Sequence, residues 1–261
     1  MSEFETMLSG CSANSATILP GWGQGRATFG GLVAALMYRA VSLSVPAPRP
    51  LRSLTISFVA PVAPGNIAFD VQLLRVGKSA SQLLCLAKQD DQTVAVMQVS
   101  QGDARDSTIS VEPPAAATFA APEQCVALPF AQGITPDFTG HFNMHWAKGS
   151  LPFCGSPEAD IGGWIRFKDE VGVANIEHLL ALVDGWPPAV LPMFKRPAPI
   201  SSLSWTLELY GDPSVQKGSD WWHYLARTDI AQEGYAGIGA EMRDAHGNLV
   251  AISRQTVSIF A

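Results

Sequence analysis

Two segments of the chain have the hydrophobic spacing of a buried helix. In residues 29–41 apolar side chains recur at intervals of three and four, and the pattern stops before Pro46. In the second segment Asn175 is a suitable N-cap for an apolar stripe over residues 176–183, which Pro187 brings to an end. The pattern therefore predicts one core helix in each half of the chain.

Four runs of strand-forming residues follow each predicted helix in the same order. They cover residues 54–60, 67–76, 81–89 and 93–100 in the first half and residues 202–210, 221–228, 237–243 and 249–260 in the second. Two further strands are expected before the second helix, at residues 139–147 and 162–168. The pair Asp90-Asp91 predicts a hairpin turn between the third and fourth strands. Ser53-Leu54-Thr55 opens the first strand after the first helix, and Ser202-Leu203-Ser204 opens its expected counterpart. A helix packed on an antiparallel sheet is thus predicted twice.

A stretch rich in proline and alanine separates the two copies. We predict an N-terminal half at residues 1–103, a linker at 104–137 and a C-terminal half at 138–261. A short sheet covered by one helix leaves strand edges unpaired, so two copies side by side can join into one sheet. The expected fold class is α+β, with the two halves forming a pseudo-dimer within the chain.

The composition narrows the classes of function. Hydrophobic residues make up 47% of the chain and charged residues 15%, which is typical of a globular protein with a sizeable core. The formal net charge of -6 and scattered cations argue against a nucleic-acid partner. The start of the chain, with Glu3 and Glu5, does not resemble a signal peptide, and no segment has membrane-spanning length. We therefore expect a cytoplasmic protein without a membrane partner, whose four cysteines are free thiols.

Six short motifs, distributed over both halves of the chain, can be compared with known families by their order and spacing. They are Phe29-Gly30-Gly31, Ser57-Phe58-Val59-Ala60-Pro61, Leu74-Arg75-Val76-Gly77-Lys78-Ser79-Ala80-Ser81, Leu182-Val183-Asp184, Ser202-Leu203-Ser204 and Leu249-Val250-Ala251-Ile252-Ser253-Arg254-Gln255. Together they resemble the double-hotdog acyl-CoA thioesterases of the thioesterase II family. The second motif departs from the family's "R-P-G", because Ala60 precedes Pro61 and Gly65 is displaced. The resemblance implies a double hotdog fold, an acyl-CoA substrate and no cofactor, and it is compatible with a homodimer of such chains.

The same resemblance assigns candidate catalytic residues in the C-terminal half. The family's catalytic aspartate falls on Asp184, its hydroxyl residue on Ser202 and its glutamine on Gln255. The hydroxyl position is commonly threonine in the family, and the alignment can also slip to Ser204.

The position of Asp184 suits a general base. It lies on or beside the apolar stripe near the helix C-terminus, where burial and the helix dipole both raise the pKa of a carboxylic acid. The alternative is that Asp184 turns to solvent where the helix frays before Gly185. A carboxylate in the site could act as a general base or, less favoured here, as a nucleophile that forms an anhydride.

Thioester hydrolysis also needs groups that position water and stabilise an oxyanion. The amide of Gln255 and the hydroxyl of Ser202 could hold a water beside Asp184, although strand alternation puts Ser202 on the face opposite Trp205. Both residues could equally be ordinary strand residues. Backbone N–H groups at Gly30 and Gly31 could bind the substrate oxygen, or these glycines could serve helix packing alone.

Other sequence features argue against a serine nucleophile and against a metal site. There is no GxSxG nucleophile motif, and His141 and His145 lack a third ligand, so no metal is expected. Residues 22–26 could form a lip over an acyl tunnel or a plain surface loop. The leading hypothesis is hydrolysis of acyl-CoA to a free acid and CoA. The alternatives are an acyl-CoA binding module without activity, and a hotdog hydratase, which would need a closely spaced Asp and His pair.

Overall fold

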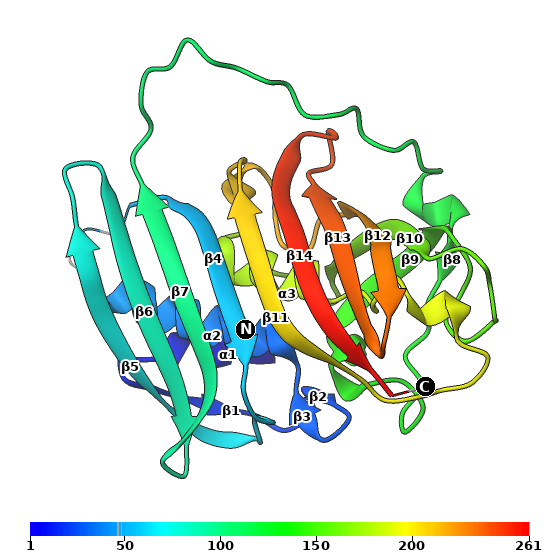
Figure 1. The fold of residues 1–261 in the computed structure, drawn as a ribbon, viewed down its shortest axis with the longest axis horizontal. Helices are drawn as coiled ribbons and strands as arrows, with labels where there is room; N and C mark the ends of the chain where they lie inside the picture. Colours follow the sequence, from blue (N-terminus) through cyan, green and yellow to red (C-terminus); the bar gives the residue numbers. More distant parts are fainter. Residues whose placement is uncertain (46, 48, 261) are drawn as a thin grey trace.

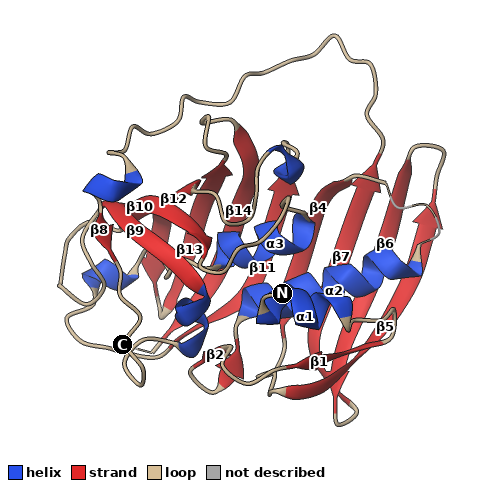
Figure 2. Ribbon diagram, turned by 180° about the vertical axis from the view of Figure 1, so that it is seen from behind, coloured by secondary structure: helices blue, strands red, loops and turns tan. Residues whose placement is uncertain are grey.

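The structure is a computed structural model that describes residues 1–45, 47 and 49–260. A single antiparallel sheet runs through the whole molecule, and the helices lie together on one face of it (Figures 1 and 2). The strand order is β1-β5-β6-β7-β4-β11-β14-β13-β12-β10-β9-β8. The central strands β4 (Leu51–Phe58) and β11 (Ile200–Leu209) join the two halves edge to edge. This arrangement confirms the predicted α+β pseudo-dimer.

The remaining elements divide between the halves. The strands are β1 (Ser15–Ile18), β5 (Gly65–Val76), β6 (Ala80–Gln89), β7 (Gln92–Gly102), β8 (Val126–Ala127), β9 (Phe142–Lys148), β10 (Asp160–Phe167), β12 (Trp222–Gln232), β13 (Tyr235–Arg243) and β14 (Leu249–Ile259), with a separate hairpin of β2 (Gly23–Gln24) and β3 (Ala27–Thr28). The helices are α1 (Glu3–Ser9), α2 (Gly30–Ser44) and α3 (Ile176–Asp184), and the 3-10 turns are η1 (Pro122–Gln124), η2 (Asp137–His141), η3 (Leu191–Met193) and η4 (Pro213–Val215). The core fills the space between the sheet and the helices, and no helix in the described residues is both long and apolar enough to span a membrane.

A pseudo-twofold relation passes through the centre of the sheet. Thr55 of β4 pairs with Thr206 of β11, and their hydroxyls lie 3.1 Å apart. From this pair outward the two halves share the same pairing register. Each half has one extra residue at equivalent points of three strands, namely Arg52 and Leu203, Leu74 and Asp229, and Val94 and Val250. A bulge is a specific feature of one strand pair, and it redirects the side chains around it. The recurrence of bulges at three equivalent points therefore supports an internal duplication.

This register corrects the alignment expected from the sequence. The counterpart of Ser53 is Ser204, because Ser53 pairs with Ser100 of β7 as Ser204 pairs with Thr256 of β14. The sequence alignment of Ser53 with Ser202 was therefore wrong by two residues. Serine or threonine recurs at alternate positions in both strands, so the motif alone could not fix the register.

Most predicted elements are confirmed with small shifts of their ends. The hairpin between β6 and β7 turns at Asp90 and Asp91, which both have positive φ angles, as a two-residue turn requires. One expectation was wrong in detail. The strand predicted from residue 139 begins only at Phe142. The preceding η2 turn places Phe138 in a stack on Phe29, with ring centroids 4.1 Å apart.

The sequence analysis missed α1. Ser2 caps this helix by accepting the backbone N–H of Glu5 at 3.2 Å. The spacing of Ser2 and Glu5 is a capping signature that could have indicated a helix start. Phe4, Met7 and Leu8 bury the inner side of α1 in the core.

The predicted linker is not free of structure along its whole length. Its residues 114–121, here called the strap, lie against the outer face of the C-terminal half. Phe119 stacks on His223 of β12 with ring centroids 4.2 Å apart, and the indole of Trp164 donates to the carbonyl of Ala120 at 2.9 Å. Gly162 of β10 makes room for the Phe119 ring, because a Cβ at this position would lie 2.8 Å from the Phe119 Cζ atom. The strap therefore covers polar and aromatic groups that alternation had turned outward.

We expect the substitution Phe119→Ala to destabilise the protein by about 1–3 kcal/mol, since it removes an aromatic stack and part-buried apolar surface. Val111 lies in the part of the linker before the strap and is 89% exposed, so Val111→Ala is a matched control with little expected effect. Chemical denaturation of the three proteins measures the difference. Equal stability of the two variants would contradict a packing role for the strap.

Candidate active site

The C-terminal end of α3 meets the N-terminal end of α2 at Asp184. A Cβ added at Gly30 would lie 2.9 Å from Asp184 Oδ2, and one added at Gly31 would lie 3.0 Å from Asp184 Cβ. The Gly31 position is further closed by the ring of Phe29, which would be 2.6 Å away. Both glycines thus allow the close helix crossing, and this crossing brings backbone N–H groups of the first turn of α2 toward the carboxylate.

The three predicted catalytic side chains are brought together. Gln255 Nε2 donates to Asp184 Oδ1 at 2.7 Å, and Ser202 Oγ donates to Gln255 Oε1 at 3.2 Å. All three residues have intermediate exposure. The two hydrogen bonds fix the orientation of the Gln255 amide, with its N–H toward the acid and its oxygen toward the hydroxyl.

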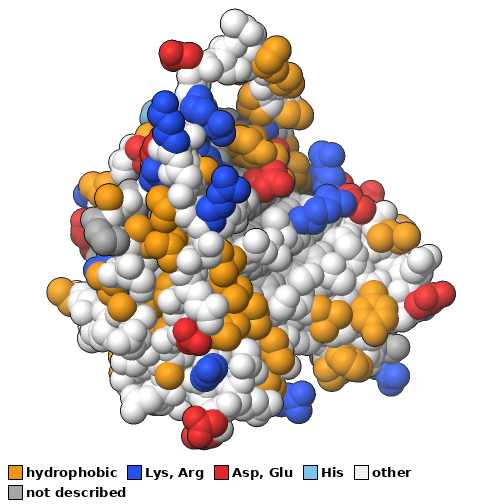
Figure 3. Space-filling view, turned by 60° about the vertical axis from the view of Figure 1, so that its left-hand side comes forward, with side chains coloured by type: hydrophobic (Ala, Val, Ile, Leu, Met, Phe, Trp, Pro, Cys, Tyr) orange, Lys and Arg blue, Asp and Glu red, His pale blue; other side chains and the backbone are white. Residues whose placement is uncertain are grey.

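A bulge in β11 explains how Ser202 reaches this group. Ser202 pairs with Val257 and Ser204 with Thr256, so Leu203 is an extra residue that reverses the alternation. Ser202 therefore shares the inner face with Trp205, contrary to the simple alternation expected from the sequence. Ser204 instead lines a shallow groove of about 300 Å³ on the outer face. Figure 3 shows uncharged groups over much of the hollowed surface of the sheet.

The environment of Asp184 raises its pKa from 3.8 to about 7. Burial is the largest cause, because it disfavours the charged carboxylate. The amide of Gln255 and the backbone N–H of Gly31 counteract part of this effect by donating toward the charged form. The acid is therefore poised between its two protonation states near neutral pH, as a general base requires.

Two aromatic residues beside the acid were not anticipated from the sequence. Trp186 follows α3 directly and stacks on Tyr224 of β12, with ring centroids 5.2 Å apart. Burial and the nearby charge of Asp184 both raise the pKa of the Tyr224 phenol, so this group stays a neutral donor. The sequence signal for Tyr224 was only a core position in a strand, since its nearness to α3 depends on the packing of the sheet.

The other highlighted residues have structural contacts. Trp22 is buried and stacks on His141 at 3.9 Å between centroids. The hairpin β2–β3 follows it, so residues 22–26 are in part a regular hairpin, with residues 24–26 exposed at its tip. His141 Nε2 lies 2.9 Å from the carbonyl of Gly21, and His145 Nδ1 lies 2.6 Å from that of Pro122. Within the described part of the chain, no three His, Cys, Asp or Glu residues are grouped as metal ligands.

The N-terminal half does not repeat the polar group. The register makes Leu51 the counterpart of Ser202 and Val99 the counterpart of Gln255. Both are buried apolar residues, at 2% and 0% exposure, that can neither donate to nor accept from a water through their side chains. The duplication has therefore kept these polar groups on one side of the pseudo-twofold only.

Comparison with known structures places the fold. A protein of unknown function with a hot dog fold from Alicyclobacillus acidocaldarius has a TM-score of 0.88 and 21% identity, covering 100% of this chain and 99% of its own. The acyl-CoA thioesterase II TesB2 of Mycobacterium marinum has a TM-score of 0.74 and 18% identity over 94% of this chain and 92% of its own. A tesB protein from Mycobacterium avium subs paratuberculosis has a TM-score of 0.79 and 17% identity, covering 99% of each chain. These similarities confirm the double hotdog fold.

Family models give the more specific result. Curated protein sequences yield no match to this chain. The model for the acyl-CoA thioesterase N-terminal domain matches residues 18–102, and the model for the C-terminal domain matches residues 122–259. The two matches fall on the two halves of the sheet, in the order that the family has. The chain therefore belongs to the acyl-CoA thioesterase family.

Proposed function

We propose that the protein hydrolyses acyl-CoA thioesters with a water molecule activated by Asp184, which acts as the general base. The observation that carries this proposal is the hydrogen-bonded series from Ser202 through Gln255 to Asp184. It supplies a part-buried acid with a pKa of about 7 and an amide held in one orientation beside it. A non-catalytic acyl-CoA binding module would have no need of a base tuned to neutral pH.

The proposed step is a direct attack by water. Asp184 takes a proton from the water, and at the same time the water oxygen bonds to the thioester carbon. The carbonyl oxygen gains negative charge and faces the N-terminal turn of α2, where the backbone N–H of Gly30 and the positive potential of the helix end stabilise it. The backbone N–H of Gly31 donates to Asp184. When the carbon–sulfur bond breaks, the leaving CoA thiolate takes up the proton and the free acid departs.

The arrangement does not suit the hydratase alternative. Such an enzyme would pair Asp184 with a nearby histidine, yet His178 on the same helix is turned to Glu5, with Nε2 and Oε1 2.6 Å apart. Asp184 itself bonds to an amide. The polar partners of the acid therefore favour water activation.

Replacing Asp184 with asparagine tests the base. We expect kcat for acyl-CoA hydrolysis to fall by about 10²–10⁴-fold, because the water loses its proton acceptor. Thiol release across acyl-CoAs of increasing length measures the rate and the preferred chain together. Asp229→Asn is the control, since Asp229 lies on the surface and pairs with Arg254 at 2.6 Å. Full activity of Asp184→Asn would contradict the mechanism, and label from H₂¹⁸O entering the Asp184 carboxylate would show that it acts as a nucleophile instead.

The pKa of Asp184 also predicts how stability depends on pH. Because the folded-state pKa of about 7 lies above the unfolded value, Asp184 stabilises the fold at low pH and loses this contribution as pH rises from about 4 through about 7. Asparagine carries no charge, so Asp184→Asn should exceed the wild type in stability at pH 8.5, by up to about 4 kcal/mol, and match it near pH 4. Thermal denaturation at the two pH values checks this. A difference that does not change with pH would contradict the raised pKa.

The bulge at Leu203 allows the two candidate serines to be separated. Ser202→Ala removes the hydroxyl that holds the Gln255 amide, and we expect kcat to fall by about 10-fold, which corresponds to one lost hydrogen bond. Ser204→Ala should leave kcat within about twofold, because Ser204 faces the outer groove. Steady-state kinetics on one substrate decides between them, and equal effects would refute the separation.

A further inference from the structure

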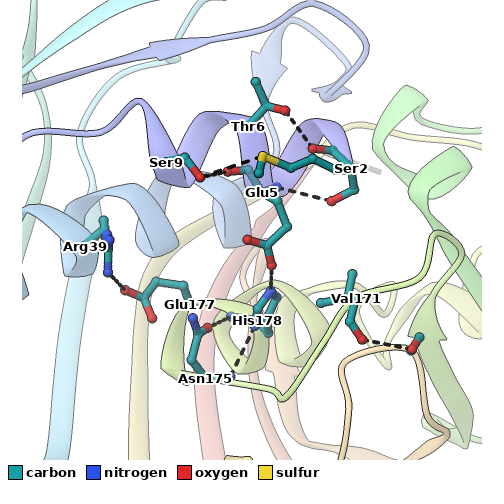
Figure 4. Close-up of polar contacts among 11 residues, drawn as sticks. Ser2, Glu5, Thr6, Ser9, Arg39, Val171, Asn175, Glu177 and His178 are labelled. Atoms are coloured by element: carbon teal, nitrogen blue, oxygen red, sulfur yellow. Dashed lines mark hydrogen bonds and ion pairs between the residues drawn. The ribbon is translucent and has the colours of Figure 1, made fainter.

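A buried polar cluster fixes the end of α3 that lies farthest from Asp184 (Figure 4). His178 Nε2 and Glu5 Oε1 of α1 lie 2.6 Å apart. Asn175 Oδ1 accepts the backbone N–H of His178 at 2.9 Å, and His178 Nδ1 accepts the backbone N–H of Asn175 at 3.2 Å. Since Nδ1 is an acceptor, the proton of the neutral imidazole sits on Nε2 and is donated to Glu5. One side chain thus completes the helix cap and ties it to another helix.

The partner helix is itself well anchored. Phe4 is 1% exposed and its ring lies 5.5 Å from the His178 ring and 5.0 Å from that of Phe167, between centroids. The indole of Trp22 donates to Glu3 Oε2 at 3.2 Å. Because α1 is held both by the core and by these contacts, Glu5 gives His178 a partner with a fixed position.

Charged groups of the neighbouring elements do not compete for this contact. Glu177 is buried beside Arg39 of α2, with Oε1 and Nη1 3.9 Å apart. Burial raises the pKa of the Glu177 carboxyl, with Arg39 opposing and Glu5 adding to the shift. Figure 4 shows Glu177 turned toward Arg39 and His178 turned toward Glu5. The contact between Glu5 and His178 is therefore a separate link between α1 and α3.

The length of α3 connects this link to the chemistry. The helix has nine residues, too few to be stable by itself, so its contacts with its neighbours define where it lies. Asp184 follows His178 by six residues, which is about 9 Å along the helix axis. Over this short distance the helix moves as one unit, so a shift of its first turn along the helix axis, or a rotation about that axis, also displaces its last turn.

We propose that Glu5 and His178 are positioning residues. They hold α3 at the position along its axis, and at the rotation about that axis, that place Asp184 against Gln255 and the first turn of α2. The role in catalysis rests on the function proposed above. The N-terminal segment of the chain thereby takes part in the activity without contact with the substrate.

The test compares Glu5→Ala with the conservative Glu5→Gln. We expect Glu5→Ala to lower kcat by about 10-fold or more with KM changed by less than about twofold, because a base displaced by a fraction of an ångström loses rate while substrate contacts remain. Glu5→Gln should keep most of the activity, since its amide oxygen can still accept from His178 Nε2. Unchanged kcat in Glu5→Ala, or equal losses in both variants, would overturn the proposal.

Leu8→Ala separates positioning from general loosening of α1. Leu8 lies on the same helix, is 5% exposed and does not contribute to the link to His178. Leu8→Ala leaves a cavity in the core, so it should lower the melting temperature at least as much as Glu5→Ala. Its kcat should stay within about twofold of the wild type. If kcat instead falls in step with melting temperature across both variants, the link has only a stabilising role.

A second readout does not depend on activity. The carboxyl ¹³C resonance of Asp184, assigned by its loss in Asp184→Asn, should titrate near pH 7 in the wild type and at lower pH in Glu5→Ala, where the displaced acid gains water. An identical titration in both proteins would refute the positioning role. Failure of the wild type to hydrolyse any acyl-CoA would refute the proposed function alone, and the titration would still decide whether Glu5 places Asp184.

Discussion

The crossing of two helices over the sheet is the constraint on which the site depends. The first turn of α2 approaches the last turn of α3 so closely that side chains at Gly30 and Gly31 would collide with Asp184 or its neighbours. A carboxylate at this crossing loses most of its hydration, and its pKa rises to about 7. The same closeness supplies the N-terminal backbone donors of α2, so one packing contact provides both the base and the place for an oxyanion.

Duplication explains why such a crossing exists within one chain. Two sheets that share the central pair β4 and β11 place their helices side by side on one face, and each helix end then faces the neighbouring helix. The two crossings have since diverged. At one end Asp184 bonds to Gln255, whereas at the other Glu177 lies beside Arg39 and His178 is tied to α1. On the proposals made above, one end of α3 carries out the chemistry and the other end fixes its geometry.

Many features of the fold follow from patterns within single segments. The stripe of α3, its Asn175 cap and the turn at Asp90 and Asp91 depend on neighbours a few residues away, so the sequence predicts them well. The match of both halves to family motifs also leads from the sequence to Asp184 and Gln255. These positions were recognised because helix end and strand motif are each local in the chain.

Contacts between distant segments could not be read in this way. The extra residue at Leu203 reverses the direction of Ser202, and a bulge is set by pairing with another strand. The approach of Tyr224 to Asp184, the strap over His223 and the bond from Glu5 to His178 join residues that are far apart in the chain. The sequence by itself determined most of the elements, the duplication and the identity of the polar residues, because these depend on local periodicity and composition. Only the tertiary structure decided which side chains meet and what pKa the acid has, because burial and orientation come from packing between elements.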